Sequence, residues 1–236
     1  MEIPSVWTRT RRQRDQPALT RQQIVAEAVA LLDADGVEAL TMRKLGARLD
    51  AGATSLYRHV ANRDELVELV VDEVYGEIEV PEIGDPAAWR AAATTCAHSV
   101  RSMILRHPWT ATLLGQVGLA YLGPNVMRLS DRMLSLFRTA GFPPGEANHA
   151  LSTVMAYVIG VGISEAAWLS TLARSGSTEQ DLVAGLRPAF EQAAAEYPHM
   201  RQQLTAYGEA DPAHARDETF TYGLERVLDG LAAVLR

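Results

Sequence analysis

Residues 36–66 read GVEALTMRKLGARLDAGATSLYRHVANRDEL, and this stretch decides the fold. Thr41 can cap a short helix whose apolar residues recur at i, i+3 and i+7, namely Met42, Leu45 and Leu49. That helix should break at Asp50, because Asp tolerates a left-handed backbone, and Gly52 can cap the helix that follows. A third short helix is expected over about 53–59. Two short helices joined by a tight turn predict a helix-turn-helix.

Amphipathic helices should brace these two on both sides. Thr20 and Gln23 form a capping-box pattern ahead of an apolar stripe, which predicts a helix over 20–35. Asn62 can cap a further helix, with Glu65 at the reciprocal position. The two short helices should therefore be part of a small helical unit.

The remainder of the chain is also expected to be helical. Pro and Gly are sparse within long periodic stretches, and the alternation that is typical of strands is nearly absent. Further helices are expected at about 85–106, 109–116, 124–140, 144–174, 178–197 and 214–236. The sequence therefore predicts an all-α fold.

A family resemblance is carried by GVEALTMRKL at 36–45, TSLYRHV at 54–60 and NRDEL at 62–66. These segments resemble the DNA-binding domain of the tetracycline-repressor (TetR) family, and the similarity covers about 18–80. Asp50 departs from the pattern, since the family usually has Gly there, and the family usually has a larger aliphatic residue in place of Ala51.

The resemblance implies three parts of the chain. A basic arm covers 1–19, a three-helix helix-turn-helix DNA-binding domain covers 20–66, and a larger helical ligand-binding and dimerisation domain covers 67–236. In the second part the third helix would enter the major groove of operator DNA. Seven residues are then expected to contact bases or phosphates: Arg43, Thr54, Ser55, Tyr57, Arg58, His59 and Arg63.

The DNA contacts should differ in kind. Arg58 can bond guanine through two donors, which is worth about 1–3 kcal/mol of discrimination. Tyr57 and His59 should bind phosphate, which sets register rather than sequence. The alternatives are that Tyr57 and His59 pack in the small helical core and that Arg58 is a solvated surface charge.

Charge is distributed unevenly along the chain, whose net charge is −7. Residues 1–63 contain ten Lys or Arg and seven acids, a net of +3, whereas the remainder contains twelve and twenty-two, a net of −10. A basic head on an acidic body suggests that only the head meets DNA, although chance asymmetry is the alternative. The basic arm contains Arg9, Arg11, Arg12 and Arg14. It could lie in the minor groove or along phosphates, or it could be a solvated tail.

The second half of the chain resembles the TetR C-terminal domain more loosely, through Trp89, His107-Pro108 and Gly141-Phe142. The resemblance implies a central pocket and a homodimer held by a four-helix bundle, to which each chain contributes 144–174 and 214–236. Residues suited to that interface are Ala147, Ala150, Val154, Val158, Val161, Phe220, Leu224, Val227, Leu231 and Val234. Alternatively, these faces pack within one chain.

Apolar walls with a few polar groups are what a small-molecule pocket requires. Seven residues are candidates to line it: Cys96, His98, Trp109, Gln116, Met127, Met155 and Trp168. Stripes of Met and Trp at helical spacing also occur in ordinary cores, so plain packing is the alternative. An ungapped count from Trp89 places Leu114 where the tetracycline repressor has its metal-binding His, so neither a metal nor a metal-tetracycline effector is expected. His98 and His107 have no evident carboxylate partner in the sequence and are interpreted as structural.

Other classes of protein are disfavoured. A single cysteine excludes an intramolecular disulfide, and no Ser-His-Asp order, HExxH, P-loop or GxGxxG motif points to an enzyme or a cofactor. No signal peptide or membrane span is expected, so the location should be cytoplasmic. The expected function is a ligand-responsive repressor that binds a palindromic operator as a homodimer and is released by a small apolar antibiotic or metabolite. The alternative is a TetR-like activator or a regulator without an effector.

Overall fold

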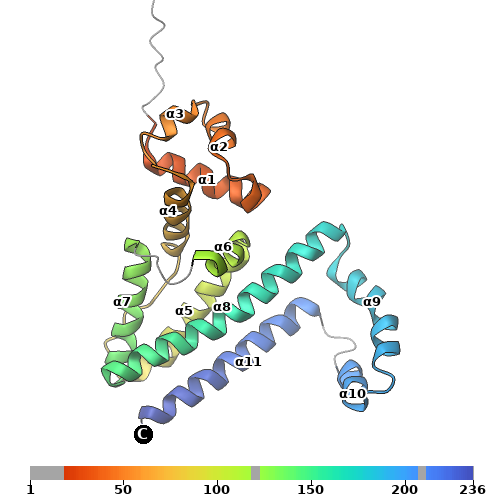
Figure 1. The fold of residues 1–236 in the computed structure, drawn as a ribbon. Helices are drawn as coiled ribbons and strands as arrows, with labels where there is room; N and C mark the ends of the chain where they lie inside the picture. Colours follow the sequence, from red (N-terminus) through yellow and green to blue (C-terminus); the bar gives the residue numbers. More distant parts are fainter. Residues whose placement is uncertain (1–18, 118–122, 207–210, 236) are drawn as a thin grey trace, which may run out of the picture.

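A computed structural model describes residues 19–117, 123–206 and 211–235, and within these ranges the chain forms helices and no strand. The expected all-α class is therefore confirmed. The basic arm lies, up to residue 18, outside the described residues. Figure 1 shows a small head made of α1–α4 above a larger body made of α5–α11.

The head contains α1 (Arg21–Asp35), α2 (Met42–Arg48), α3 (Ala53–Leu56) and α4 (Arg63–Tyr75). The predicted caps are present, because the amide of Gln23 donates to Thr20 Oγ1 over 3.2 Å and the amide of Glu65 donates to Asn62 Oδ1 over 2.8 Å. Asp50 has a φ of 46°, so the left-handed break after α2 is confirmed. One buried core joins the four helices: Ile24, Ala28, Leu31, Leu45, Leu56, Val60, Leu66 and Val70.

Helix α3 is shorter than the predicted 53–59. The amide of His59 donates to the carbonyl of Leu56 over 2.9 Å, an i to i−3 bond that tightens the chain into a turn. Leu56 and Val60 are 0% and 1% exposed. The turn therefore brings both apolar side chains into the core and leaves the residues between them on the surface.

The body is built around a 32-residue helix, α8 (Pro144–Ser175), which lies along α5 (Trp89–Arg106), α7 (Pro124–Thr139) and α11 (Pro212–Ala232). By length and composition alone, α8 is apolar enough to cross a membrane. Its packed face is instead part of the core of the body. Three rings pack edge to face near the start of α5, with Phe142 5.5 Å from Trp89 and 5.4 Å from Phe137 between centroids.

Two helices stand apart from the rest of the body, as Figure 1 shows. They are α9 (Glu179–Ala193) and α10 (Pro198–Ala206). The sequence predicted one helix over 178–197 and missed α10. Helix α9 already ends at Ala193, and a turn follows it. A proline suits the first position of a helix, so Pro198 begins α10.

The predicted dimer residues divide into two groups. Six of them are buried within the chain itself, so the prediction that they form the dimer interface is wrong: Ala147, Ala150, Val154, Val158, Phe220 and Leu224. Four of these residues lie on α8, and Phe220 and Leu224 lie on α11. The two helices pack against each other and against α5, so the alternative of packing within one chain holds for these residues. Val161, Val227 and Leu231 are half-buried, and Val234 is 45% exposed.

Candidate DNA-binding head and ligand cavity

The short α3 and the turn after it present polar side chains on one surface of the head. Tyr57 is 51% exposed, and Thr54 and Arg58 are also exposed. Ser55 and His59 are half-buried. The interpretation of Tyr57 as a core residue is therefore wrong, because Leu56 and Val60 on either side fill that role.

The cations of the head differ in whether they have partners. Lys44 pairs with Asp35, with 2.7 Å between Nζ and Oδ2, and Arg48 pairs with Glu27. In the part of the chain that the structure describes, Arg43 and Arg58 form no ion pair. Both guanidinium groups are exposed, so they are available to an anionic partner.

Arg63 is held at the start of α4. Its Nε donates to the carbonyl of Leu40 over 3.2 Å, which ties α4 to the segment just before α2. Arg21 likewise donates through Nε to the carbonyl of His59 over 3.2 Å. These two contacts fix the backbone around the turn, and Arg63 remains exposed at a helix N-terminus that itself favours anions.

His107 has carboxylate partners that sequence reasoning missed. It is 3% exposed, and its Nδ1 lies 2.7 Å from Asp33 Oδ1 while its Nε2 lies 3.1 Å from Glu77 Oε1. Trp109 Nε1 donates to the same oxygen of Asp33 over 2.6 Å. The expectation of no carboxylate partner is therefore wrong. The two acids lie 74 and 30 residues before His107, a separation that no local pattern reveals.

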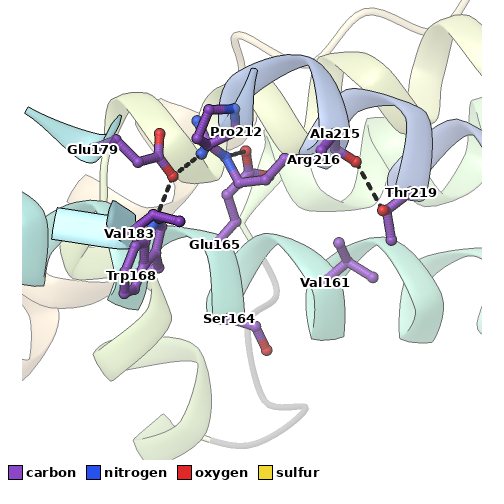
Figure 2. A pocket seen from close by; sticks show the side chains of 10 residues that line it. All are labelled: Val161, Ser164, Glu165, Trp168, Glu179, Val183, Pro212, Ala215, Arg216 and Thr219. Atoms are coloured by element: carbon purple, nitrogen blue, oxygen red, sulfur yellow. Dashed lines mark hydrogen bonds and ion pairs between the residues drawn. The ribbon is translucent and has the colours of Figure 1, made fainter. Parts of the chain in front are cut away.

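A cavity of about 470 Å³ opens between α8, α9 and α11. Figure 2 shows its lining, in which Val161, Val183, Pro212 and Ala215 provide apolar surface. Its polar residues are Ser164, Glu165, Trp168, Glu179, Arg216 and Thr219. This combination of a mostly apolar wall with a few polar groups is typical of small-molecule sites.

The polar residues of this cavity form a connected network. Trp168 Nε1 donates to Glu179 Oε1 over 2.6 Å, and Arg216 pairs with the same oxygen. Arg216 Nε also donates to Glu165 Oε1 over 3.2 Å. The three helices that line the cavity are therefore joined by charge-assisted hydrogen bonds, which hold its polar groups in place.

Behind the cavity, Arg101 from α5 completes the network. It binds Glu165 through two hydrogen bonds of 2.7 and 2.8 Å and also pairs with Asp217 at 2.7 Å. Hydrogen bonding to Glu165 raises the pKa of Arg101, although burial opposes it. The guanidinium lies 4.7 Å over the ring of Phe220. The carboxylate of Glu165 is thus held by two arginines on two other helices.

The structure does not bring the seven predicted ligand residues into one cavity. Trp168 lines the cavity of Figure 2, and Trp109 lines a second one, of about 720 Å³, between head and body. Gln116 is in α6 (Trp109–Val117), and its side chain lies outside the described part of the structure. Met127 is 45% exposed on α7, and Met155 is half-buried against the core.

Cys96 and His98 lie on α5 away from both cavities. Cys96 is fully buried in the core, and this burial raises the pKa of its thiol to about 12. The His98 ring packs edge to face on Phe220, with 5.0 Å between centroids. Burial and the neighbouring Arg101 guanidinium lower the pKa of His98, so this side chain is neutral at pH 7.

The glutamates and arginines of the cavity were missed by sequence reasoning. Glu165, Glu179 and Arg216 belong to three helices that meet only in the folded chain, so no spacing in the sequence joins them. The one signal was Glu165 itself, a charged residue in the otherwise apolar run of α8. A charge in such a run suggests a buried partner.

Two family models match the chain. The model described as "Bacterial regulatory proteins, tetR family" covers residues 24–70, and "Tetracyclin repressor-like, C-terminal domain" covers 81–235. The chain belongs to the TetR family. It is therefore a TetR-family transcriptional regulator, with the family's helix-turn-helix head and helical C-terminal domain.

Relatives in the TetR family extend over almost the whole chain. An HTH-type transcriptional regulator of Saccharopolyspora erythraea is 36% identical over 97% of this chain and 92% of its own length. The HTH-type transcriptional repressor DrrR1 of Streptomyces coeruleorubidus is 34% identical over 93% and 79%. The TetR family protein ActR of Streptomyces coelicolor, solved with actinorhodin, is similar with a TM-score of 0.76 and 31% identity, over 92% and 97% of the two chains.

Proposed function

We propose that this chain is a homodimeric repressor that binds a palindromic operator and releases it when a small molecule occupies the body. The observation that carries the proposal is the surface of the head around α3. There Arg43 on α2 and Arg58 after α3 are exposed, without ion-pair partners among the described residues, and Arg58 follows the exposed Tyr57 directly. One relative is named a repressor, which supports repression rather than activation.

In this proposal α3 lies in the major groove and its exposed side chains read base edges. Arg58 binds a guanine through two donors, and Thr54 and Ser55 contact neighbouring bases or phosphates. Tyr57, His59 and Arg63 bind phosphates on either side, and Arg43 reaches base or phosphate from α2. Phosphate contacts of this kind fix the register of the helix.

A dimer is required for a palindrome to be read, because two copies of a head meet two half-sites about 34–36 Å apart or multiples of that spacing. The buried residues of α8 and α11 are used within the chain, so the partner must contact the faces that remain. On α8 these carry the exposed Thr153, Gly160 and Ser164. On α11 they carry the exposed Tyr222, and the exposed Val234 lies just after that helix. We propose that these faces form the four-helix bundle.

The effector site proposed here is the cavity between α8, α9 and α11. Its volume of about 470 Å³ suits a small organic molecule, since ligand pockets are typically about 300–1,000 Å³. The apolar wall would bind a ring system, while Ser164 and Thr219 offer hydroxyl groups at its edge. ActR, solved with actinorhodin, supports a small-molecule effector. No metal is required by this site.

A repressor acts where the chromosome is, so we propose that the protein works in the cytoplasm on double-stranded DNA and without contact with a membrane. The test is selection of bound duplexes from a random pool at two salt concentrations. The expected result is an inverted repeat whose two halves are one helical turn or a multiple apart. Enrichment of an asymmetric sequence, or of none at either salt, would reject the proposal.

A further inference from the structure

Head and body are joined by a cluster of side chains around the buried His107. This residue lies in the turn between α5 and α6, and its ring contacts Asp33 on α1 and Glu77 just after α4. Trp109, at the start of α6, donates to Asp33 as well. We call Asp33, Glu77, His107 and Trp109 the joint. It connects the body to α1 and to the segment just after α4. Helices α1 and α4 lie before and after the helix-turn-helix in the chain.

The hydrogen bonds of the joint fix the orientation of its side chains. Each ring nitrogen of His107 lies within hydrogen-bonding distance of a carboxylate oxygen, so the ring is held between two acids from different parts of the head. Asp33 Oδ1 accepts from both His107 and Trp109, and Glu77 also pairs with Arg106 of α5. Hydrogen bonds between ionised groups are the stronger kind, and they hold the side chains at fixed angles.

A second attachment lies on the other side of α4. Asp72 Oδ1 accepts hydrogen bonds from the amides of Asn125 and Val126 over 2.9 and 3.1 Å, at the start of α7. Asn125 Nδ2 donates back to the carbonyl of Asp72 over 2.9 Å. One attachment would let the head swivel. Because the joint holds α1 and the segment just after α4, while Asp72 ties the last turn of α4 to the start of α7, the head is attached to the body at two separate points and its angle is constrained.

Space for movement lies directly beside the joint. The cavity of about 720 Å³ is lined by Asp33, Val37 and Glu38 of the head and by residues of α6 and α8 such as Trp109 and Arg174. Side chains therefore do not fill the volume between α1 and the second half of α8. If the joint opens, the head can tilt into this volume without displacing packed residues.

We propose that His107 is the positioning residue for operator recognition: its contacts with Asp33 and Glu77 fix the head angle, and thereby the distance between the two reading helices of a dimer. This inference rests on the proposed function, because head spacing matters only to a dimer on a palindrome. It goes further in naming the residues that set the spacing. His107 touches no DNA, so its effect must appear as altered geometry rather than as a lost contact.

The first test measures the head angle without DNA. Spin labels are attached to the exposed positions Ala47→Cys on α2 and Asp131→Cys on α7, in chains diluted with unlabelled protein, and their separation is measured by pulsed dipolar spectroscopy. The fully buried Cys96 should not react with the label. One narrow separation is expected in the otherwise wild-type chain. In His107→Gln, whose single amide replaces the bridging ring, the distribution should widen or split.

The second test measures operator affinity against the separation of the half-sites. His107→Gln should lose about tenfold on the best palindrome, tolerate other separations better, and keep its affinity for a single half-site. A merely destabilised head would lose half-site affinity too. Asp33→Asn keeps side-chain size, and Trp109→Phe removes the indole donor to Asp33. Both should shift the two readouts in the same direction as His107→Gln, so they test the inference if His107→Gln does not fold.

The matched control is His199→Gln, the same change at an exposed histidine at the start of α10, which should alter neither readout. A narrow label separation together with an unchanged spacing profile in the joint variants would overturn the inference. If the unchanged protein ignores every palindrome, the proposed function fails, while the label separation still decides whether His107 fixes the head angle.

Discussion

Glu165→Gln tests the buried network that underlies the ligand cavity. The carboxylate accepts two hydrogen bonds from Arg101, whose side chain is 9% exposed, and one from Arg216. Breaking a buried ion pair by removing one partner costs about 3–5 kcal/mol. Two features reduce this loss, because Arg101 keeps Asp217 and Arg216 keeps Glu179. We therefore expect the free energy of unfolding to fall by about 2–3 kcal/mol.

The assay is urea unfolding followed by circular dichroism at fixed protein concentration, since a dimer makes stability depend on concentration. In thermal unfolding, the melting temperature of Glu165→Gln should fall by about 4–12 °C for a chain of this length. Glu191→Gln is the control, because its partner Arg187 is on the exposed face of α9, and the change should be within about 0.5 kcal/mol. A Glu165→Gln protein as stable as the control would refute the reasoning that the network is desolvated and strongly coupled.

Three further predictions follow from burial and close packing. Cys96, with its pKa raised to about 12, should resist a thiol reagent at pH 8 in the native protein and react once urea unfolds it; rapid native reaction would contradict its placement in the core. Gly223→Ala should lower the free energy of unfolding by about 1–3 kcal/mol, because its new Cβ would overlap the Tyr157 ring. Gly185→Ala is the control, because the space around Gly185 is open. Equal urea midpoints for the two variants would contradict this packing. The lowered pKa of His98 favours its neutral form in the folded chain, so stability should fall as pH drops below 6.5, and His98→Gln should make the urea midpoint less dependent on pH there; an unchanged slope would contradict that assignment.

Local signals made the head predictable from sequence. Caps such as Thr20 and Asn62 act within three residues, so their effect can be read directly, and the left-handed Asp50 follows from side-chain type. The apolar period also indicated that Leu56 and Val60 are buried. The length of α3 was overestimated, because the bond that tightens the turn after Leu56 has no signature of its own in the sequence.

Contacts between distant helices could not be predicted. A period of 3.6 residues shows that α8 has an apolar face but not whether that face meets α5, α11 or a second chain, so residues such as Val154 were assigned to a dimer interface. The same limit hid the partners of His107 and the cavity network around Glu165. The role of a histidine or an acid depends on neighbours that packing brings close. Those neighbours cannot be identified from spacing in the sequence.

The central claim is that α3 and the turn after it read base sequence, with Arg58 in that turn as the reading residue. It is tested most directly by fluorescence anisotropy titrations of the wild-type protein, Arg58→Ala and Arg63→Ala against the selected palindrome and a scrambled duplex of the same length. We predict that Arg58→Ala lowers the ratio of the two affinities by about 5- to 150-fold for each half-site, because each subunit of the dimer loses one bidentate guanine contact. Arg63→Ala should weaken both duplexes alike and leave that ratio unchanged. An Arg58→Ala protein that keeps the full wild-type ratio would contradict the claim.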